Sequence, residues 1–236
     1  MRPLPTHPDP AALTEGRVLL RSTPGIGTEW YDRLGKTAKD AVRDQRLREQ
    51  GYFCAYTEIR LADRFHIEHM YAQDHCDPEE KVDYSNLVLC FPDSKWNPGF
   101  GAVEKGNWPD RSQRAQFIRA LDPSCATRFR YENDGRMTAK DPSNSAAAET
   151  IRRLKLDEPP DPDNPTSHVL RKRRAETISA TLLSLKTATQ ARKSLESMRS
   201  TANANGRLPE FVSARREALE RYIKRLEDRI KYSRRA

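Results

Sequence analysis

The pattern of hydrophobic and polar positions predicts a mixed α and β organisation in the first two thirds of the chain. Residues 37–50 contain strong helix formers and no helix breaker, and Gly51 follows at the position of a C-terminal cap. This segment is therefore predicted to be a helix. Residues 1–28 are interrupted by several prolines and glycines, which predicts an arm or loop.

The central segment predicts the order strand, loop, strand, loop, helix. A β-like stretch ends in His66–His69, and the apolar run Leu87–Leu89 is typical of a buried strand. A short helix is expected over 102–108, because Pro109 would stop it. The other elements expected here are a helix at 111–121, a strand and turn at 128–135, and a helix at 145–156.

The C-terminal part of the chain is predicted to be helical. The proline-rich stretch at 158–162 cannot be helix and indicates a linker. Beyond it, residues 167–202 and 208–233 carry apolar residues at helical spacing, and Ala202–Gly206 separates them. We interpret these apolar stripes as the packing seams of a helical hairpin rather than as a cofactor site.

Charge is distributed unevenly along the sequence. The chain carries 42 Lys and Arg against 34 Asp and Glu, and residues 151–236 hold 21 of the basic residues but only 11 of the acidic ones. A basic region of this kind indicates a surface that faces a polyanion such as nucleic acid, although solvated charged helices alone would also explain it.

Two features of composition bear on location. No apolar run approaches the length needed to span a bilayer, so no membrane association is expected. The N-terminus begins Met1-Arg2-Pro3-Leu4-Pro5 and lacks the apolar segment of a secretory signal. The expected location is the cytoplasm, where the four cysteines would be thiols or metal ligands.

The residues best suited to chemistry lie in the segment His66-Ile67-Glu68-His69. Side chains alternate along a strand, so His66 and Glu68 share one face and His69 points elsewhere. Glu68 can hold a divalent cation that neutralises phosphate charge. His69 can accept a proton from an attacking water, because an imidazole titrates near neutral pH. Without its context, however, this short motif is better explained by structure or chance.

The context is a series of motifs in a fixed order. They are Phe53-Cys54-Ala55-Tyr56-Thr57-Glu58, then His66–His69, then Tyr84-Ser85-Asn86-Leu87-Val88-Leu89-Cys90, and finally Glu104-Lys105-Gly106-Asn107. The series resembles the HNH nuclease signature. More narrowly, it is similar to the HNH nuclease subunit of the Septu antiphage defence system and its retron-associated relatives. The resemblance covers roughly residues 30–185.

The resemblance implies a small ββα-metal (HNH) core within mostly helical surroundings, an α+β fold, with a C-terminal helical hairpin. It also implies a role for each matched residue. Glu68 would bind Mg²⁺ or Mn²⁺, His69 would be the general base and a further metal contact, and Asn86 would orient His69 or fix the loop. Lys105 and Asn107 would lie near DNA phosphate, or Lys105 would cap the helix. His66 belongs to the motif, and a structural role for it is as well supported as a catalytic one.

Two departures from the family pattern stand out. The family builds a zinc knuckle from two C-x-x-C pairs, but Thr57 and Gly101 stand at the second and fourth positions. Cys54 and Cys90 are thus remnants, and no structural zinc is predicted there. The usual third metal ligand lies three residues before the helix lysine, where this chain has Ala102. Asn107, Glu104 or Asn97 could substitute for it.

These expectations define four regions and several competing functions. The regions are an N-terminal arm (1–29), an HNH nuclease domain (30–157), a proline-rich linker (158–166) and a basic helical C-terminal region (167–236). The first function is a metal-dependent DNA endonuclease that acts with an ATPase partner of the Septu type. The second is a catalytically degenerate adaptor or DNA-binding subunit of the same kind of complex. A third is an architectural nucleic-acid-binding protein. The C-terminal helices could also support self-association.

Overall fold

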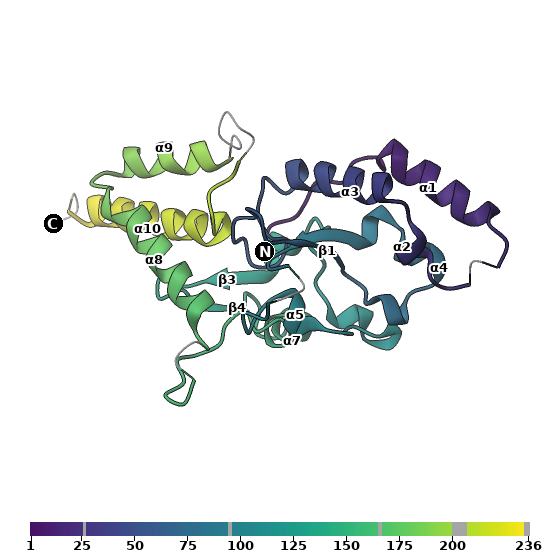
Figure 1. Ribbon diagram of the computed structural model, residues 1–236. Coiled ribbons are helices and arrows are strands. Elements are labelled where there is room, and N and C mark those ends of the chain that lie inside the picture. The colour runs from purple at the N-terminus through teal and green to yellow at the C-terminus, as the bar shows by residue number, and fades with distance from the viewer. Residues whose placement is uncertain (26, 94–95, 165–166, 200–206, 234–236) are drawn as a thin grey trace.

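The computed structural model describes residues 1–25, 27–93, 96–164, 167–199 and 207–233. It is a mostly helical α+β fold with two small two-stranded antiparallel sheets. Helices α1, α2 and α4 lie at one end of the molecule and α8–α10 at the other, while α3 runs alongside the β1–β2 hairpin between them (Figure 1). No helix among the described residues is long and apolar enough to cross a membrane.

The bounds of the elements are as follows. The helices are α1 (Ala11–Ser22), α2 (Trp30–Arg33), α3 (Lys36–Glu49), α4 (Pro78–Lys81), α5 (Ala102–Lys105), α6 (Cys125–Arg128), α7 (Ser145–Arg153), α8 (Val169–Leu183), α9 (Ala188–Arg199) and α10 (Val212–Ser233). The strands are β1 (His66–His69), β2 (Leu87–Cys90), β3 (Phe129–Tyr131) and β4 (Met137–Ala139). Short 3-10 helices are η1 (Gln73–His75), η2 (Tyr84–Asn86) and η3 (Arg111–Gln116).

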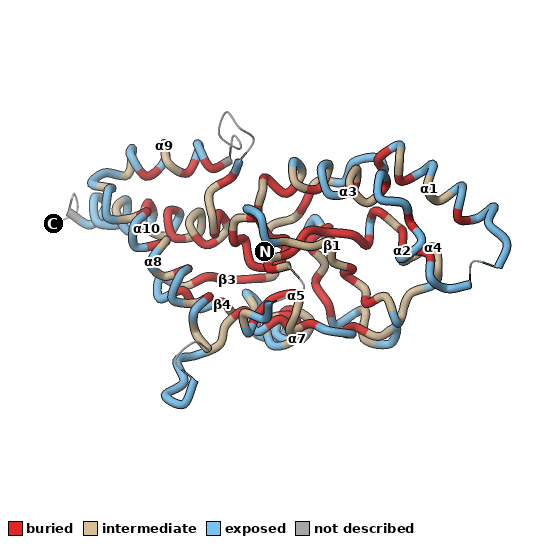
Figure 2. Tube along the Cα trace, in the orientation of Figure 1, coloured by how far each residue is buried: buried red, intermediate tan, exposed pale blue. Residues whose placement is uncertain are grey.

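The β1–β2 hairpin lies at the centre of the fold. Its strands pair antiparallel, with His66 opposite Cys90 and Glu68 opposite Val88. Every residue of β2 is buried, which confirms the buried strand expected at Leu87–Leu89 (Figure 2). Because β2 is covered on both faces, its backbone groups must find partners within the protein.

Helix α3 is fixed against β2 by buried polar side chains. The Gln50 amide donates to the carbonyl of Leu89 at 2.9 Å and accepts from the Leu89 N–H at 2.8 Å. One turn earlier, the Arg46 guanidinium stacks 3.6 Å from the Tyr84 ring and bonds the Tyr84 carbonyl. The expected helix at 37–50 is thus confirmed, and Gly51 follows it with a φ of 64°.

The prediction of a loop over residues 1–28 is wrong for part of that segment. Residues 11–22 form helix α1, which packs against α3. Leu13 and Leu20 are seven residues apart, so they share one face of the helix, and both are buried. The prolines that suggested a loop lie on either side of this helix, and Pro10 directly precedes it.

Three expected helices are shorter than predicted, and one of them is α7, which ends at Arg153 rather than at Leu156. Helix α5 ends at Lys105 rather than at Trp108, because Gly106 adopts a φ of 52° that a helix cannot continue. Residues 111–116 form a 3-10 helix rather than an α-helix over 111–121. It starts at Arg111 as predicted, and the Asp110–Gln113 capping box marks this start.

The described residues of the C-terminal region form three helices rather than two. The segment expected to be one helix over 167–202 breaks after Leu183, and α9 starts at Ala188. Gln190 accepts hydrogen bonds from the backbone of Lys186 and Thr187, while the Thr187 hydroxyl accepts one from the Gln190 N–H. This reciprocal cap begins a new helix. Helices α9 and α10 pack together, and the separator expected at 202–206 lies outside the described residues.

We predict that Gly135→Ala strongly destabilises the contact between the β3–β4 turn and α8. Gly135 has a φ of 81°, and an added Cβ would lie 2.1 Å from the Arg171 carbonyl oxygen in α8. The loss in free energy of unfolding should be about 3 kcal/mol or more. Gly99→Ala is the matched control, since Gly99 has a φ of 79° and no atom within 4 Å of an added Cβ. It should cost about 1–2 kcal/mol. Urea unfolding measures both variants, and equal losses in the free energy of unfolding would contradict this account.

Candidate functional site

Glu68 and Lys105 form the centre of the candidate site. Strand β1 carries Glu68 and helix α5 carries Lys105, and the Lys105 Nζ lies 2.9 Å from the Glu68 Oε1. The Lys105 side chain is 1% exposed and the Glu68 side chain 14%. Lys105 therefore does not lie on an open surface where it would meet phosphate.

The remaining hydrogen-bond donors of Lys105 are also used. Its Nζ donates to the Trp108 carbonyl at 2.9 Å and to the Gly106 carbonyl at 3.3 Å, both just beyond the end of α5. An ammonium group has three protons, and here three oxygens surround it. The lysine thus serves as an internal cation for Glu68 and binds the chain at the C-terminal end of the helix.

His66 is a second hydrogen-bonding partner of Glu68. Its Nε2 lies 3.3 Å from the Glu68 Oε2, and its Nδ1 lies 2.5 Å from the Pro92 carbonyl. Burial disfavours the imidazolium, but the hydrogen bond and charge of Glu68 outweigh it, so the pKa of His66 is raised. For Glu68, burial is outweighed by Lys105 and His66, and its pKa is lowered.

His69 points away from this cluster, as the alternation of strand side chains predicted. Its Nε2 lies 2.8 Å from the Lys81 carbonyl, and the Tyr31 ring packs edge-on at 4.5 Å. The residue is 5% exposed. Burial lowers the pKa of His69 to about 4, so the ring is neutral at pH 7. A neutral ring that donates through Nε2 keeps a lone pair on Nδ1.

Asn86 fixes the loop between β1 and β2. Its Oδ1 accepts from the Tyr71 N–H at 2.7 Å, and its Nδ2 donates to the carbonyls of Tyr71 and Glu80, both at 3.2 Å. The resemblance implied that Asn86 either orients His69 or fixes the loop. Its contacts are those of a residue that fixes the loop. It holds the backbone that follows His69 rather than the imidazole itself.

The three candidates for a third metal ligand are engaged elsewhere. Asn107 is exposed and donates to Asp74 at 2.6 Å, while Asn97 donates to Glu104 at 3.0 Å. Glu104 is also paired with Lys155 at 2.7 Å. Ala102, at the usual ligand position, is 5% exposed and belongs to the hydrophobic core.

The residues at this site do not fit a divalent cation held by three side chains. No group of three His, Cys, Asp or Glu side chains lies close enough together to bind a metal in the described part of the chain. The Glu68 carboxylate at the site is paired with the Lys105 ammonium group. A divalent cation would have to displace Lys105 from three hydrogen bonds.

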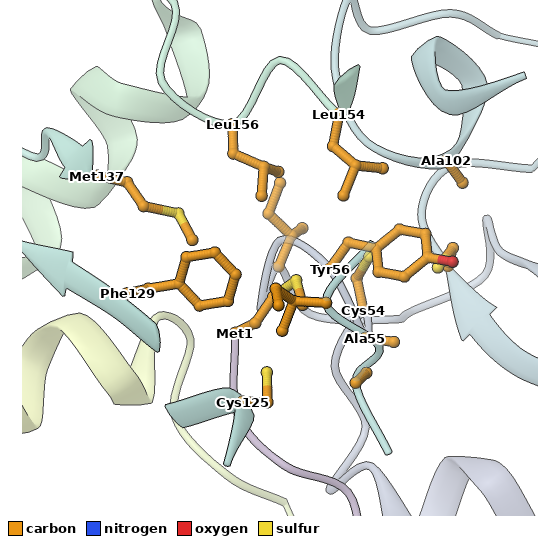
Figure 3. Close-up of a cluster of buried hydrophobic side chains, with 14 of the residues drawn as sticks. Met1, Cys54, Ala55, Tyr56, Ala102, Cys125, Phe129, Met137, Leu154 and Leu156 are labelled. Atoms are coloured by element: carbon orange, nitrogen blue, oxygen red, sulfur yellow. The ribbon is translucent and has the colours of Figure 1, made fainter. Parts of the chain in front are cut away.

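The four positions of the family's zinc knuckle lie together in the core. Cys54 and Cys90 are fully buried, and Figure 3 shows Cys54 and Tyr56 within the apolar cluster that also holds Ala102. Thr57 lies beside Gly101, where an added Cβ would be 3.4 Å from its methyl group. Burial alone would raise the pKa of the Cys54 thiol. Hydrogen bonds with Cys90, Thr57 and the Phe91 amide outweigh this effect, so the pKa of Cys54 is lowered. Hydrogen bonding therefore connects Cys54 with Cys90 and Thr57, while the Gly101 N–H bonds the Leu154 carbonyl.

Two basic residues that lie beside His66 were not predicted from the sequence as part of the site. A cavity between α3 and β1 is lined by Tyr31, Lys39, Arg43, Phe65 and His66, among others. Lys39 and Arg43 are four residues apart in α3 and so share one face of the helix. That spacing was visible in the sequence, but only the folded chain shows that this face meets the motif strand.

Comparisons with known proteins assign no family to this chain. A scan against protein-family models finds none that matches this chain, and a search of curated proteins finds no similar sequence.

We predict that Glu68 and Lys105 are strongly coupled in stability. Lys105→Met leaves the Glu68 carboxylate without its main partner, which should cost about 3–5 kcal/mol. Glu68→Gln combined with Lys105→Met should cost less than the two single changes added together, because the double change removes both charges. Urea unfolding of the four proteins measures the coupling. Strictly additive losses would show that the ion pair contributes nothing.

We also predict a pH dependence of stability that comes from His69. Its pKa is about 4 in the folded chain and about 6.5 when unfolded, so between these values the unfolded chain binds an extra proton. Stability should therefore rise with pH across this window, by up to about 3 kcal/mol, and be fully present above it. His69→Gln should remove this rise. Unfolding curves at pH 4.5 and 7.0 for both proteins test it, and an unchanged pH dependence in the variant would exclude His69 as its source.

Proposed function

We propose that this chain is an HNH-fold DNA-binding subunit of an antiphage defence complex, acting as an adaptor beside an ATPase of the Septu type. The observation that carries the proposal is the Lys105–Glu68 ion pair of 2.9 Å, because it engages with an ammonium group the carboxylate that the resemblance assigns to a divalent cation. The ordered motifs and the β1–β2–α5 arrangement support the HNH part of the proposal.

The basic C-terminal helices support the DNA-binding part. Lys172 in α8, Lys193 in α9 and Lys224 in α10 are all exposed. Such side chains can contact phosphate and release bound counterions. Binding through them should carry little sequence preference, since phosphate contacts position a protein rather than read bases. The same helices offer a surface on which an ATPase subunit could dock.

A second candidate function is a metal-dependent DNA endonuclease that cuts with Mg²⁺ or Mn²⁺. One observation favours it, namely the state of His69. The imidazole is neutral and is oriented by the Lys81 carbonyl at 2.8 Å, so that its Nδ1 is free to accept a proton. Its exposure of 5% and its position on the opposite face of β1 from Glu68 oppose this function in the arrangement described here.

DNA binding and plasmid cleavage by the purified protein distinguish the two functions. The adaptor should bind DNA with an affinity that falls at least tenfold between 50 and 200 mM salt, and should leave supercoiled plasmid uncut with either cation. The assay is run on the wild type, Glu68→Gln and His69→Ala, each alone and with the ATPase subunit. A cation-dependent cut that disappears in His69→Ala would replace the adaptor with the nuclease. Cutting that persists in both variants would indicate a contaminant. Absence of DNA binding would refute the proposal itself.

A further inference from the structure

The cavity between α3 and β1 has the size and the side chains of a nucleotide site. Its volume is about 350 Å³, and it opens beside His66 at the start of the motif strand. Ligand pockets begin at roughly 300 Å³, which is enough for one nucleotide but too small for a duplex. We call this cavity the α3–β1 pocket.

Two cation–aromatic pairs form its walls. The Lys39 Nζ lies 4.7 Å from the Tyr31 ring centroid, and the Arg43 guanidinium lies 4.3 Å from that of Phe65. These contacts hold the two long basic side chains in place before any ligand binds, which reduces the entropy lost on binding.

Arg43 has its hydrogen-bond donors available. In the described part of the chain it takes part in no ion pair or hydrogen bond, although its guanidinium carries five N–H donors. Lys39 donates only to the Asp32 carbonyl, at 3.3 Å. The acidic side chain in the lining, Asp40, is paired with Lys36 at 2.5 Å, so it does not cancel the charge of Arg43.

We propose that the α3–β1 pocket binds one unpaired nucleotide of a DNA strand. Lys39 and Arg43 contact the phosphate, and the base packs against the aromatic side chains of Tyr31 and Phe65. An unpaired nucleotide fits because its base can leave the stack and enter a small cavity. This inference rests on the proposed DNA-binding function and gives it a location beside β1, apart from the basic C-terminal helices.

The test compares two double variants with the same change in charge. Lys39→Glu with Arg43→Glu reverses the pocket cations, while Arg21→Glu with Arg48→Glu reverses two exposed arginines that do not line the pocket. Fluorescence anisotropy with a labelled 20-nucleotide thymidine strand and a 20-base-pair duplex measures affinity at 100 mM salt. The pocket variant should bind the single strand at least tenfold more weakly than the wild type, and the control at most threefold. Circular dichroism melting shows that both variants are folded.

A second measurement needs no variant. A strand carrying 5-iodouracil is photo-crosslinked to the wild-type protein, and the crosslinked peptide should contain Tyr31 or Phe65. Equal weakening in the two double variants, or crosslinks confined to α8–α10, would overturn the pocket while leaving the DNA-binding function in place. Tighter binding of duplex than of single strand would overturn the unpaired nucleotide. If the wild type binds neither DNA, the proposed function and the pocket both fail.

Discussion

The buried free edge of β2 is the constraint on which the rest of the structure depends. A two-stranded sheet leaves one edge of each strand unpaired, and here the edge of β2 lies inside the protein, where water cannot satisfy it. The Gln50 amide bonds both the N–H and the carbonyl of Leu89, and the Ala55 N–H bonds the same carbonyl at 3.0 Å. These bonds fix α3 and the chain around Cys54 against one side of the hairpin. The other strand of the hairpin, β1, carries the residues of the candidate site.

That arrangement determines the environment of Glu68. With β2 enclosed, β1 places Glu68 in a position that is only 14% exposed, where an unpaired carboxylate would be costly. Compensation comes from two partners within the chain itself, the Lys105 ammonium group and the His66 imidazole. Each is tied to backbone carbonyls as well, so the charge cluster also connects β1 to α5 and to the segment at Pro92. The same contacts that stabilise the carboxylate therefore reduce its capacity to bind an added cation.

Local patterns predicted the elements whose stability is local. The helix at 37–50 and the apolar strand at 87–89 were found because helix formers, a terminal glycine and an apolar run act over short distances. Helix α1 was not predicted because prolines flank it and Gly16 lies within it, although Leu13 and Leu20 have helical spacing. The Lys105–Glu68 pair could not have been predicted, since the two residues are brought together only when α5 packs beside the hairpin. When two residues are far apart along the chain, the sequence does not show that they will form an ion pair, even if both belong to a known motif.

The positions that the resemblance assigns to a zinc knuckle are stabilised in the same way as the Glu68 cluster, by other groups of the chain. Thr57 and Gly101 cannot supply thiolates, and the Cys54 sulfur instead accepts hydrogen bonds from Cys90, Thr57 and the Phe91 amide. At both places, groups of the protein itself engage the side chains that the resemblance assigns to metal ions. Hydrogen bonds and an internal ammonium can hold this scaffold together, so loss of ligands need not lead to loss of the fold. The α3–β1 pocket lies beside the same motif strand, since His66 and Ile67 of β1 line it together with residues of α3.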